Sequence, residues 1–221
     1  MFTGIIESFG TIKKIESNGE GRVLHIACDL DLSDTKIGDS IAVNGACLTA
    51  VRLEKNAFTV DMAPETVART TFKYLTSGSR VNIERALKLS DRIDGHLVSG
   101  HIDGTGIISS VTRKSNAIII KTDVPEKLAQ DMIEKGSVAI EGISLTINRC
   151  SNNNFEVSII PHTAQITTIG RKGVGDEVNI ETDVIGKYVK KILTGSRSKN
   201  DALPGGKKDI SLDLLAKNGF L

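Results

Sequence analysis

Few side chains in this sequence suit chemistry near neutral pH. An imidazole titrates near neutrality and can act as a general base, and the chain has four histidines and three cysteines. The cysteines are odd in number and include no close pair, which argues against a disulfide framework and a structural zinc site; they are Cys28, Cys47 and Cys150. We therefore expect reduced thiols and no bound metal.

The elements that must position these groups form an internal repeat. Four blocks recur in one order with an offset of 96 or 97 residues: 2–12 with 98–108, 40–49 with 137–146, 58–71 with 155–168, and 78–84 with 175–181. A repeat of this length is too long for a solenoid unit and suits a small domain. The pattern predicts two copies of one fold.

Each copy reads as a series of short strands. The segments are rich in Val, Ile and Thr, often alternate, and are separated by Gly, Asn and Asp about every ten residues, which is typical of antiparallel strands. The first-copy candidates are residues 22–30, 40–45, 47–53, 58–63 and 80–86. Five or six strands in under about a hundred residues favour a small closed barrel, because closure removes exposed edges.

Helices are expected at few places. Residues 64–72 and their partner 161–169 each begin with proline and predict a short helix. Residues 183–193 have apolar side chains at helical spacing and predict an amphipathic helix, which docks on its own barrels or on a partner subunit. Residues 194–208 are predicted to be a mobile linker, and 209–221 to form a further short helix.

Composition excludes several classes of function. Lys and Arg number 28 against 27 Asp and Glu, so the positive field that nucleic acid or anionic membrane binding requires is missing. The first eight residues lack a basic segment before an apolar one, and no stretch reaches the roughly 18 apolar residues of a membrane span. These features predict a cytoplasmic protein that binds neither nucleic acid nor membrane.

Several blocks together resemble the riboflavin synthase family. They are the opening MFTGIIE, GDSIAVNGACLT, the junction DGHLVSGHIDGTG, KGSVAIEGISLT, and the pair PETVARTT and IIPHT. The blocks stand in the family's order and cover residues 1 to about 190. The resemblance implies an all-β fold of two similar six-stranded Greek-key β-barrels related by internal duplication, plus a C-terminal α-helix. It divides the chain into lumazine-binding barrels at 1–97 and 98–186 and a helical, mobile tail at 187–221.

The resemblance also implies a reaction. One 6,7-dimethyl-8-ribityllumazine gives a four-carbon unit to a second, yielding riboflavin and 5-amino-6-ribitylaminouracil, with no cofactor. Two similar pockets that hold two copies of one ligand face to face make the step effectively intramolecular, which contributes on the order of 7 to 11 kcal/mol. The family further implies a homotrimer held by C-terminal helices, a site between barrels of neighbouring subunits, and association with lumazine synthase.

Positions that differ between the copies are expected to assign unequal chemical roles. Cys47 aligns with Ser144, and His101 aligns with Ile5. By resemblance the catalytic positions are Phe2, Ser40, Cys47 and His101. His101 is the expected base toward the lumazine 7-methyl group, Cys47 and Ser40 act on ring carbon 7 of the acceptor directly or through water, and Phe2 shapes the pocket.

The remaining candidates bind substrate, through backbone groups near glycines, threonine hydroxyls and neighbouring side chains. They are Gly4, Ile5, Ile6, Leu48, Thr49, Asp61, Met62, Ala63, Pro64, Glu65, Thr66, Gly100, Ile102, Lys135, Ser144, Leu145, Thr146, Ser158, Ile159, Ile160, Pro161, His162 and Thr163. His25 and His96 match no pattern and are interpreted as structural.

Three other readings compete. Lumazine proteins of luminous bacteria resemble the same family but only hold a chromophore, and they typically lose the catalytic-position residues, which this chain retains. A flavin reductase would need a nucleotide-binding half, yet the segment at Gly104 lacks the third glycine of that motif and no βαβ pattern follows. A purely structural duplicated barrel explains none of the matched blocks.

Overall fold

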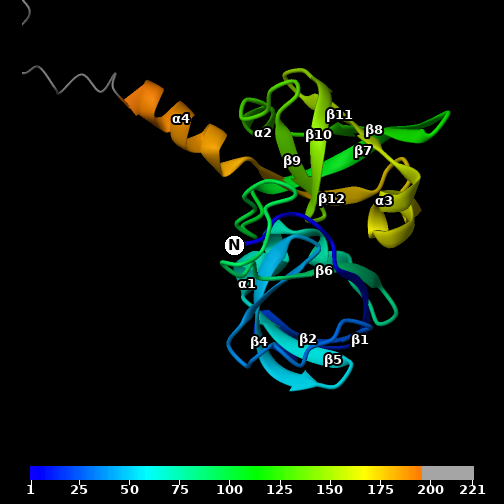
Figure 1. Cartoon of the computed structure of the whole chain (residues 1–221), viewed down its shortest axis with the longest axis vertical. Helices are drawn as coiled ribbons and strands as arrows, with labels where there is room; N and C mark the ends of the chain where they lie inside the picture. Colours follow the sequence, from blue (N-terminus) through cyan, green and yellow to red (C-terminus); the bar gives the residue numbers. More distant parts are fainter. Residues whose placement is uncertain (196–221) are drawn as a thin grey trace, which may run out of the picture. The chain divides into compact units, whose positions relative to one another are not determined.

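The computed structural model describes residues 1–195, and two closed antiparallel β-barrels dominate it (Figure 1). The first barrel closes in the order β1-β2-β5-β4-β3-β6. Its strands are β1 (Ser8–Asn18), β2 (Gly21–Cys28), β3 (Ser40–Val43), β4 (Ala46–Glu54), β5 (Ala57–Met62) and β6 (Arg80–Arg85). The order in which β5 returns beside β2 is a Greek key, and β1, absent from the strand candidates of the sequence, completes it.

The second barrel repeats this topology, in the order β7-β8-β11-β10-β9-β12. Its strands are β7 (Gly104–Lys114), β8 (Ala117–Asp123), β9 (Ser137–Ile140), β10 (Ile143–Cys150), β11 (Asn154–Ile159) and β12 (Glu177–Thr182). Even the irregularities recur, because the register shift at Ala50 in β4 has its counterpart at Ile147 in β10. The all-β prediction of two duplicated six-stranded barrels is confirmed.

Buried apolar residues alternate with more exposed residues along the strands, so each barrel has its own apolar core. In β4, Ala46, Leu48 and Ala50 are buried in the first core, whereas Cys47 and Thr49 are more exposed. In β10 the same alternation buries Leu145 and leaves Ser144 and Thr146 on the outer face. A two-residue period therefore places the polar candidates outside the barrels.

A short helix follows the fifth strand of each barrel, as predicted, but it ends earlier than the predicted ranges 64–72 and 161–169. Helix α1 (Pro64–Arg69) ends before Thr70, which is extended, and a 3-10 helix follows at Thr71–Tyr74. The Thr70 hydroxyl donates to the Thr66 carbonyl at 2.6 Å and accepts from the Phe72 amide, so it closes the helix while Phe72 enters the core. The copy repeats this break, with α3 (Pro161–Ile166) and a 3-10 helix at Thr168–Arg171.

Two further helices complete the described chain: α2 (Glu126–Ala129) and α4 (Val184–Gly195). The amphipathic helix predicted over 183–193 is confirmed by α4, whereas the linker and final helix predicted for 194–221 lie almost wholly outside the described residues. Residues 1–187 form one compact unit, and a second begins at Tyr188 within α4. Among residues 1–195 no helix has the length and apolar character that crossing a membrane requires.

The two barrels meet at a seam with approximate twofold symmetry. Gly45 and Gly142 have φ values of +82° and +81° and lie so close that a Cβ on either would meet the other's backbone nitrogen at 2.6 or 2.7 Å. The side-chain amide of Asn82 donates to the backbone carbonyl of Glu141 at 2.9 Å, and the side-chain amide of Asn179 donates to the backbone carbonyl of Asn44 at 3.0 Å. Reciprocal contacts thus join equivalent positions of the two copies.

Candidate functional site

The segment that precedes each barrel crosses the seam and contacts the barrel of the other copy. We call residues 2–7 the first arm and residues 98–103 the second arm. Phe2 and Val98 form an antiparallel bridge, with amide-to-carbonyl distances of 2.8 and 3.1 Å. In Figure 1 the blue N-terminal segment accordingly runs beside the green segment that begins the second copy. Ile6 of the first arm belongs to the core of the second barrel, and Ile102 of the second arm packs against the core of the first.

The same exchange appears in the backbone hydrogen bonds. The Ser144 amide in β10 donates to the Gly4 carbonyl at 2.8 Å, and the Cys47 amide in β4 donates to the Gly100 carbonyl at 2.8 Å. Each outer face that carries candidate residues is therefore bordered by the arm of the other copy. The predicted residues fall into two half-sites, each built from both halves of the chain.

The first half-site consists of Ser40, Cys47, Thr49, Asp61 and His101. Thr49 pairs with Ser40 on one side and with Asp61 on the other, so these three positions lie in one row across β3, β4 and β5. Cys47 is a free, half-buried thiol two residues before Thr49 on the same face. His101 is exposed and follows Gly100, whose carbonyl Cys47 binds. A thiol, two hydroxyls and a carboxylate thus share one face of the first barrel, and the second arm brings the backbone next to His101 against it.

The second half-site consists of Gly4, Ile5, Ser144 and Thr146, together with a residue that the sequence interpretation set aside. His96 Nδ1 lies 2.7 Å from Ser144 Oγ. His96 is buried, and this burial lowers its pKa, while the charge of Asp183 acts in the opposite direction. Burial therefore favours the neutral form of the imidazole, which is the form that can accept a proton.

His96 is the functional candidate that sequence reasoning missed. The comparison of the two copies cannot find it, because its counterpart would precede the first residue of the chain. Its signal is its place in the junction, five residues before His101. The other histidine interpreted as structural, His25, lies 3.1 Å from Thr59 Oγ1 and 3.3 Å from Glu16 on the first barrel, and neither half-site includes these residues.

Several predicted site residues, one catalytic (Phe2) and four substrate-binding, are buried. The side chains of Phe2, Leu48, Met62, Leu145 and Ile159 are at most 8% exposed. Phe2 packs with Val98, Ala42 and Ala139 at the seam. The side chains of these five residues pack in the barrel cores or at the seam.

The other predicted residues border the half-sites. Ala63 caps α1, and Pro64, Glu65 and Thr66 form its first turn. In the second copy Ile160 caps α3, and Pro161, His162 and Thr163 form its first turn; most of these eight residues are exposed. Ser158 is exposed in β11. Lys135 is exposed with a φ of +64° and stands where the first copy has Gly38.

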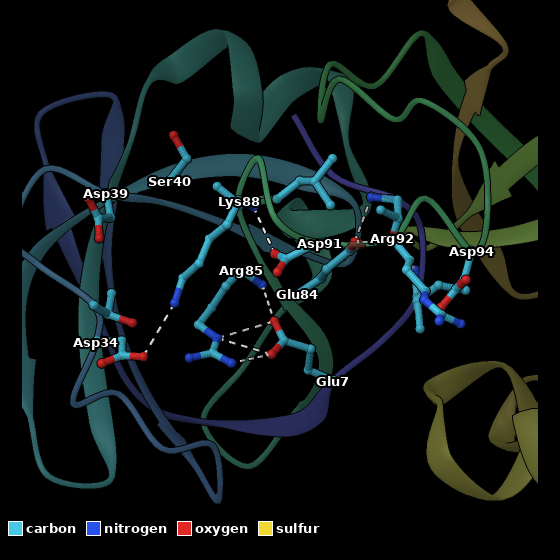
Figure 2. Close-up of a pocket in the computed structure, with 15 residues that line it drawn as sticks. Glu7, Asp34, Asp39, Ser40, Glu84, Arg85, Lys88, Asp91, Arg92 and Asp94 are labelled. Carbon is cyan, nitrogen blue, oxygen red and sulfur yellow. Dashed lines mark hydrogen bonds and ion pairs between the residues drawn. The ribbon is translucent and has the colours of Figure 1, made fainter.

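A separate hollow of about 640 Å³ opens beside the first half-site (Figure 2). Of the predicted residues only Ile5 and Ser40 line it, and most of its other side chains are charged. Arg85 is held by Glu7 at 2.6 Å and Lys88 by Asp34 at 3.3 Å, as the dashed lines in Figure 2 show. These two cations therefore already have carboxylate partners within the hollow.

Comparison with known proteins agrees with this duplicated arrangement. The family model described as Lumazine binding domain matches the chain twice, at residues 3–86 and 99–183. The riboflavin synthases of Photobacterium phosphoreum and Bacillus subtilis are each 43% identical to it, over alignments that cover 100% of both chains. The chain belongs to the riboflavin synthase family. The resemblance noted in the sequence is thereby confirmed.

Solved structures resemble this riboflavin synthase family member in fold. LumP complexed with 6,7-dimethyl-8-(1'-D-ribityl) lumazine has a TM-score of 0.73 and 25% identity, covering 82% of this chain and 99% of that one. LumP complexed with riboflavin has a TM-score of 0.75 at 25% identity with the same coverage. Lumazine and flavin ligands are therefore bound by proteins of this fold.

Proposed function

We propose that this chain catalyses the transfer of a four-carbon unit between two molecules of 6,7-dimethyl-8-ribityllumazine, giving riboflavin and 5-amino-6-ribitylaminouracil. The observation that carries the proposal is the reciprocal exchange of arms, which builds two half-sites of matching backbone from a duplicated chain. Two similar half-sites suit two copies of one substrate. The full-length identity to riboflavin synthases supports the same activity. Atoms balance between the two lumazines, so the net reaction needs no external oxidant or reductant.

The unequal side chains of the half-sites suit unequal steps. The donor lumazine must lose a proton from its 7-methyl group, and His96, buried and hydrogen-bonded to Ser144, is the proposed base. The acceptor ring must be activated at carbon 7, and Cys47 with Ser40 is proposed to add there or to hold water there. His101, which the sequence suggested as the base, stands beside Cys47 and is proposed to exchange protons in that half-site.

Binding is proposed to rest on the shared positions. Thr49 and Thr146 are equivalent, and both are exposed on the outer strand faces, where their hydroxyls can bind a ribityl chain or a pyrimidinedione edge. Lys135, Ser158 and the N-caps and first turns of α1 and α3 are proposed to border the ligands. The carbonyls of Thr66 and Thr163 already accept hydrogen bonds at 2.6 Å from Thr70 and Thr167, which holds these borders in place.

Anaerobic incubation of the purified protein with the lumazine tests the activity. We expect riboflavin and the uracil product in equal amounts without added cofactor. A fluorescence change without product would instead support the binding-only reading. Hydrogen exchange at the 7-methyl group in deuterated water, followed by proton NMR, tests the base: His96→Gln should slow enzyme-dependent exchange more than His101→Gln. Equal slowing by both variants would contradict the assignment.

We further propose a cytoplasmic homotrimer in which residues 1–97, 98–186 and 187–221 act as two barrels and a tail. Apolar side chains of α4 remain exposed in the single chain, namely Ile185, Tyr188, Val189, Ile192 and Leu193, and a partner subunit would cover them. Light scattering after size exclusion should give three times the mass of 23.7 kDa. Association with lumazine synthase, proposed because that enzyme supplies the substrate, would appear as co-sedimentation of the two purified proteins.

A further inference from the structure

Each arm is hydrogen-bonded, near its start, to a buried carboxylate of its own barrel. Glu84 in β6 is 4% exposed, and its side chain faces the first arm. Its Oε1 accepts hydrogen bonds from the Thr3 amide at 2.6 Å and the Thr3 hydroxyl at 2.9 Å, and both oxygens lie 3.1 Å from the Gly4 amide. One carboxylate therefore binds two successive residues of the arm.

Glu181 repeats the arrangement in the second copy and is 1% exposed. Its Oε1 accepts from the Ser99 amide at 2.7 Å and the Ser99 hydroxyl at 2.6 Å, and its Oε2 accepts from the Gly100 amide at 3.0 Å. The His101 amide in turn donates to the Ser99 hydroxyl at 3.2 Å. A chain of hydrogen bonds thus runs from the carboxylate to the backbone of His101.

The need to fill a buried position does not explain why a carboxyl group stands at Glu84 and Glu181. Burial raises the pKa of both Glu84 and Glu181, and the hydrogen bonds from the arms act against that shift. An apolar side chain would avoid the cost of burying a carboxyl group. What the carboxylates supply is geometry: at Gly100, with φ of +83°, the amide is held by Glu181 while the carbonyl accepts from Cys47.

We propose that Glu181 is a positioning residue of the first half-site and Glu84 a positioning residue of the second. Each glutamate therefore acts on the half-site of the other barrel. Glu84 belongs to the barrel that carries Cys47, yet it holds the arm that borders Ser144. Glu181 acts through Ser99 on Gly100 and His101, which border Cys47. This inference rests on the proposed function only for its effect on turnover.

The matched test uses the hydroxyl residues that link each carboxylate to its arm. Ser99→Ala removes the hydrogen bonds from Ser99 Oγ to Glu181 and from His101 to Ser99, and Ser99→Thr restores a hydroxyl of the type found at Thr3. Thr3→Val makes the equivalent deletion in the first arm. The local readout is the alkylation rate of Cys47 by iodoacetamide, assigned by mass spectrometry, because thiol reactivity depends on access.

Loosening the second arm should raise the Cys47 alkylation rate about tenfold in Ser99→Ala, as expected for the loss of a buried hydrogen bond. Ser99→Thr and Thr3→Val should stay near the wild-type rate. Glu181→Gln should behave like Ser99→Ala, because its amide nitrogen would face the Gly100 amide, and Glu84→Gln should behave like Thr3→Val. Equal rates in Ser99→Ala and Thr3→Val would overturn the proposal, since a general loss of stability would affect both alike.

Turnover of the lumazine by the same proteins separates this inference from the proposed function. We expect kcat to fall about tenfold in both Ser99→Ala and Thr3→Val, because the reaction needs both half-sites, and Ser99→Thr to recover it. An unchanged kcat in Ser99→Ala would contradict a positioning role. If wild-type protein forms no riboflavin while the alkylation pattern holds, the proposed function fails and the arm assignment stands.

Discussion

Replacing Gly45 by alanine is the most direct test of how the seam supports both half-sites. The φ of +82° costs a non-glycine residue about 1 to 2 kcal/mol. The new Cβ would also lie 2.6 Å from the nitrogen and 2.8 Å from the Cα of Gly142. These neighbours are backbone atoms, so no side-chain rotation relieves the contact, and the barrels must move apart.

The magnitude follows from what such a movement breaks. Two hydrogen bonds from a side-chain amide to a backbone carbonyl cross the same seam, from Asn82 to Glu141 and from Asn179 to Asn44. With each worth about 0.5 to 1.5 kcal/mol, the free energy of unfolding should fall by roughly 2 to 5 kcal/mol in all. Activity should fall as well, because the hydrogen bonds from Cys47 and Ser144 to the arms also span the barrels.

Urea denaturation at constant pH measures the effect, with Gly19→Ala as the control. Gly19 has a φ of +63°, and beyond its chain neighbours no atom lies within 4 Å of the place that a Cβ would take. Its replacement should therefore cost only the conformational term of about 1 to 2 kcal/mol. A Gly45→Ala protein that is no less stable than Gly19→Ala would refute the argument that the seam is sterically closed.

Three other predictions concern charge and packing. Glu141 is fully buried, and burial raises its pKa, so its contribution to stability is present below its ordinary pKa and is lost as pH rises through the raised value. As pH rises above the ordinary carboxyl pKa, urea unfolding should therefore favour Glu141→Gln increasingly over wild type, by up to about 1.4 kcal/mol per pH unit, and parallel curves would contradict this. If His96 is the base, its lowered pKa means that kcat/KM should fall on the acid side only below about pH 6.5. Because the charge of Asp183 raises the pKa of His96, Asp183→Asn should move this fall to still lower pH. A move toward alkaline pH would exclude the assignment. Phe2 is completely buried, so Phe2→Ala should cost about 3 to 5 kcal/mol of unfolding free energy. Phe2→Leu leaves a smaller cavity and should cost less, with activity retained; loss of activity in a stable Phe2→Leu protein would instead indicate a contact between the ring and the ligand.

The fold could be predicted because its signals are local and repeated. Alternating apolar residues define the strands, and the offset of 96 or 97 residues requires two copies of whatever one copy forms. The extent of the helix at 64–72 could not be predicted in this way. The break at Thr70 depends on Phe72 reaching the core and on the Thr71 amide binding the Asn179 side chain at 2.8 Å in the other barrel.

The candidate site was predictable in its members but not in its grouping. Cys47 and Ser144 could be named as unequal partners because equivalent positions align in the two copies. The sequence alone also determined that the chain is a duplication and that its reactive groups are few, since periodicity and composition are properties of the chain itself.

Only the tertiary structure decided that each arm borders the barrel of the other copy, that His101 therefore stands beside Cys47, and that His96 contacts Ser144. The physical reason is that two equal barrels offer each arm two equivalent docking faces. Local sequence does not distinguish these faces; the closed contact of Gly45 with Gly142 and the bridge between Phe2 and Val98 do.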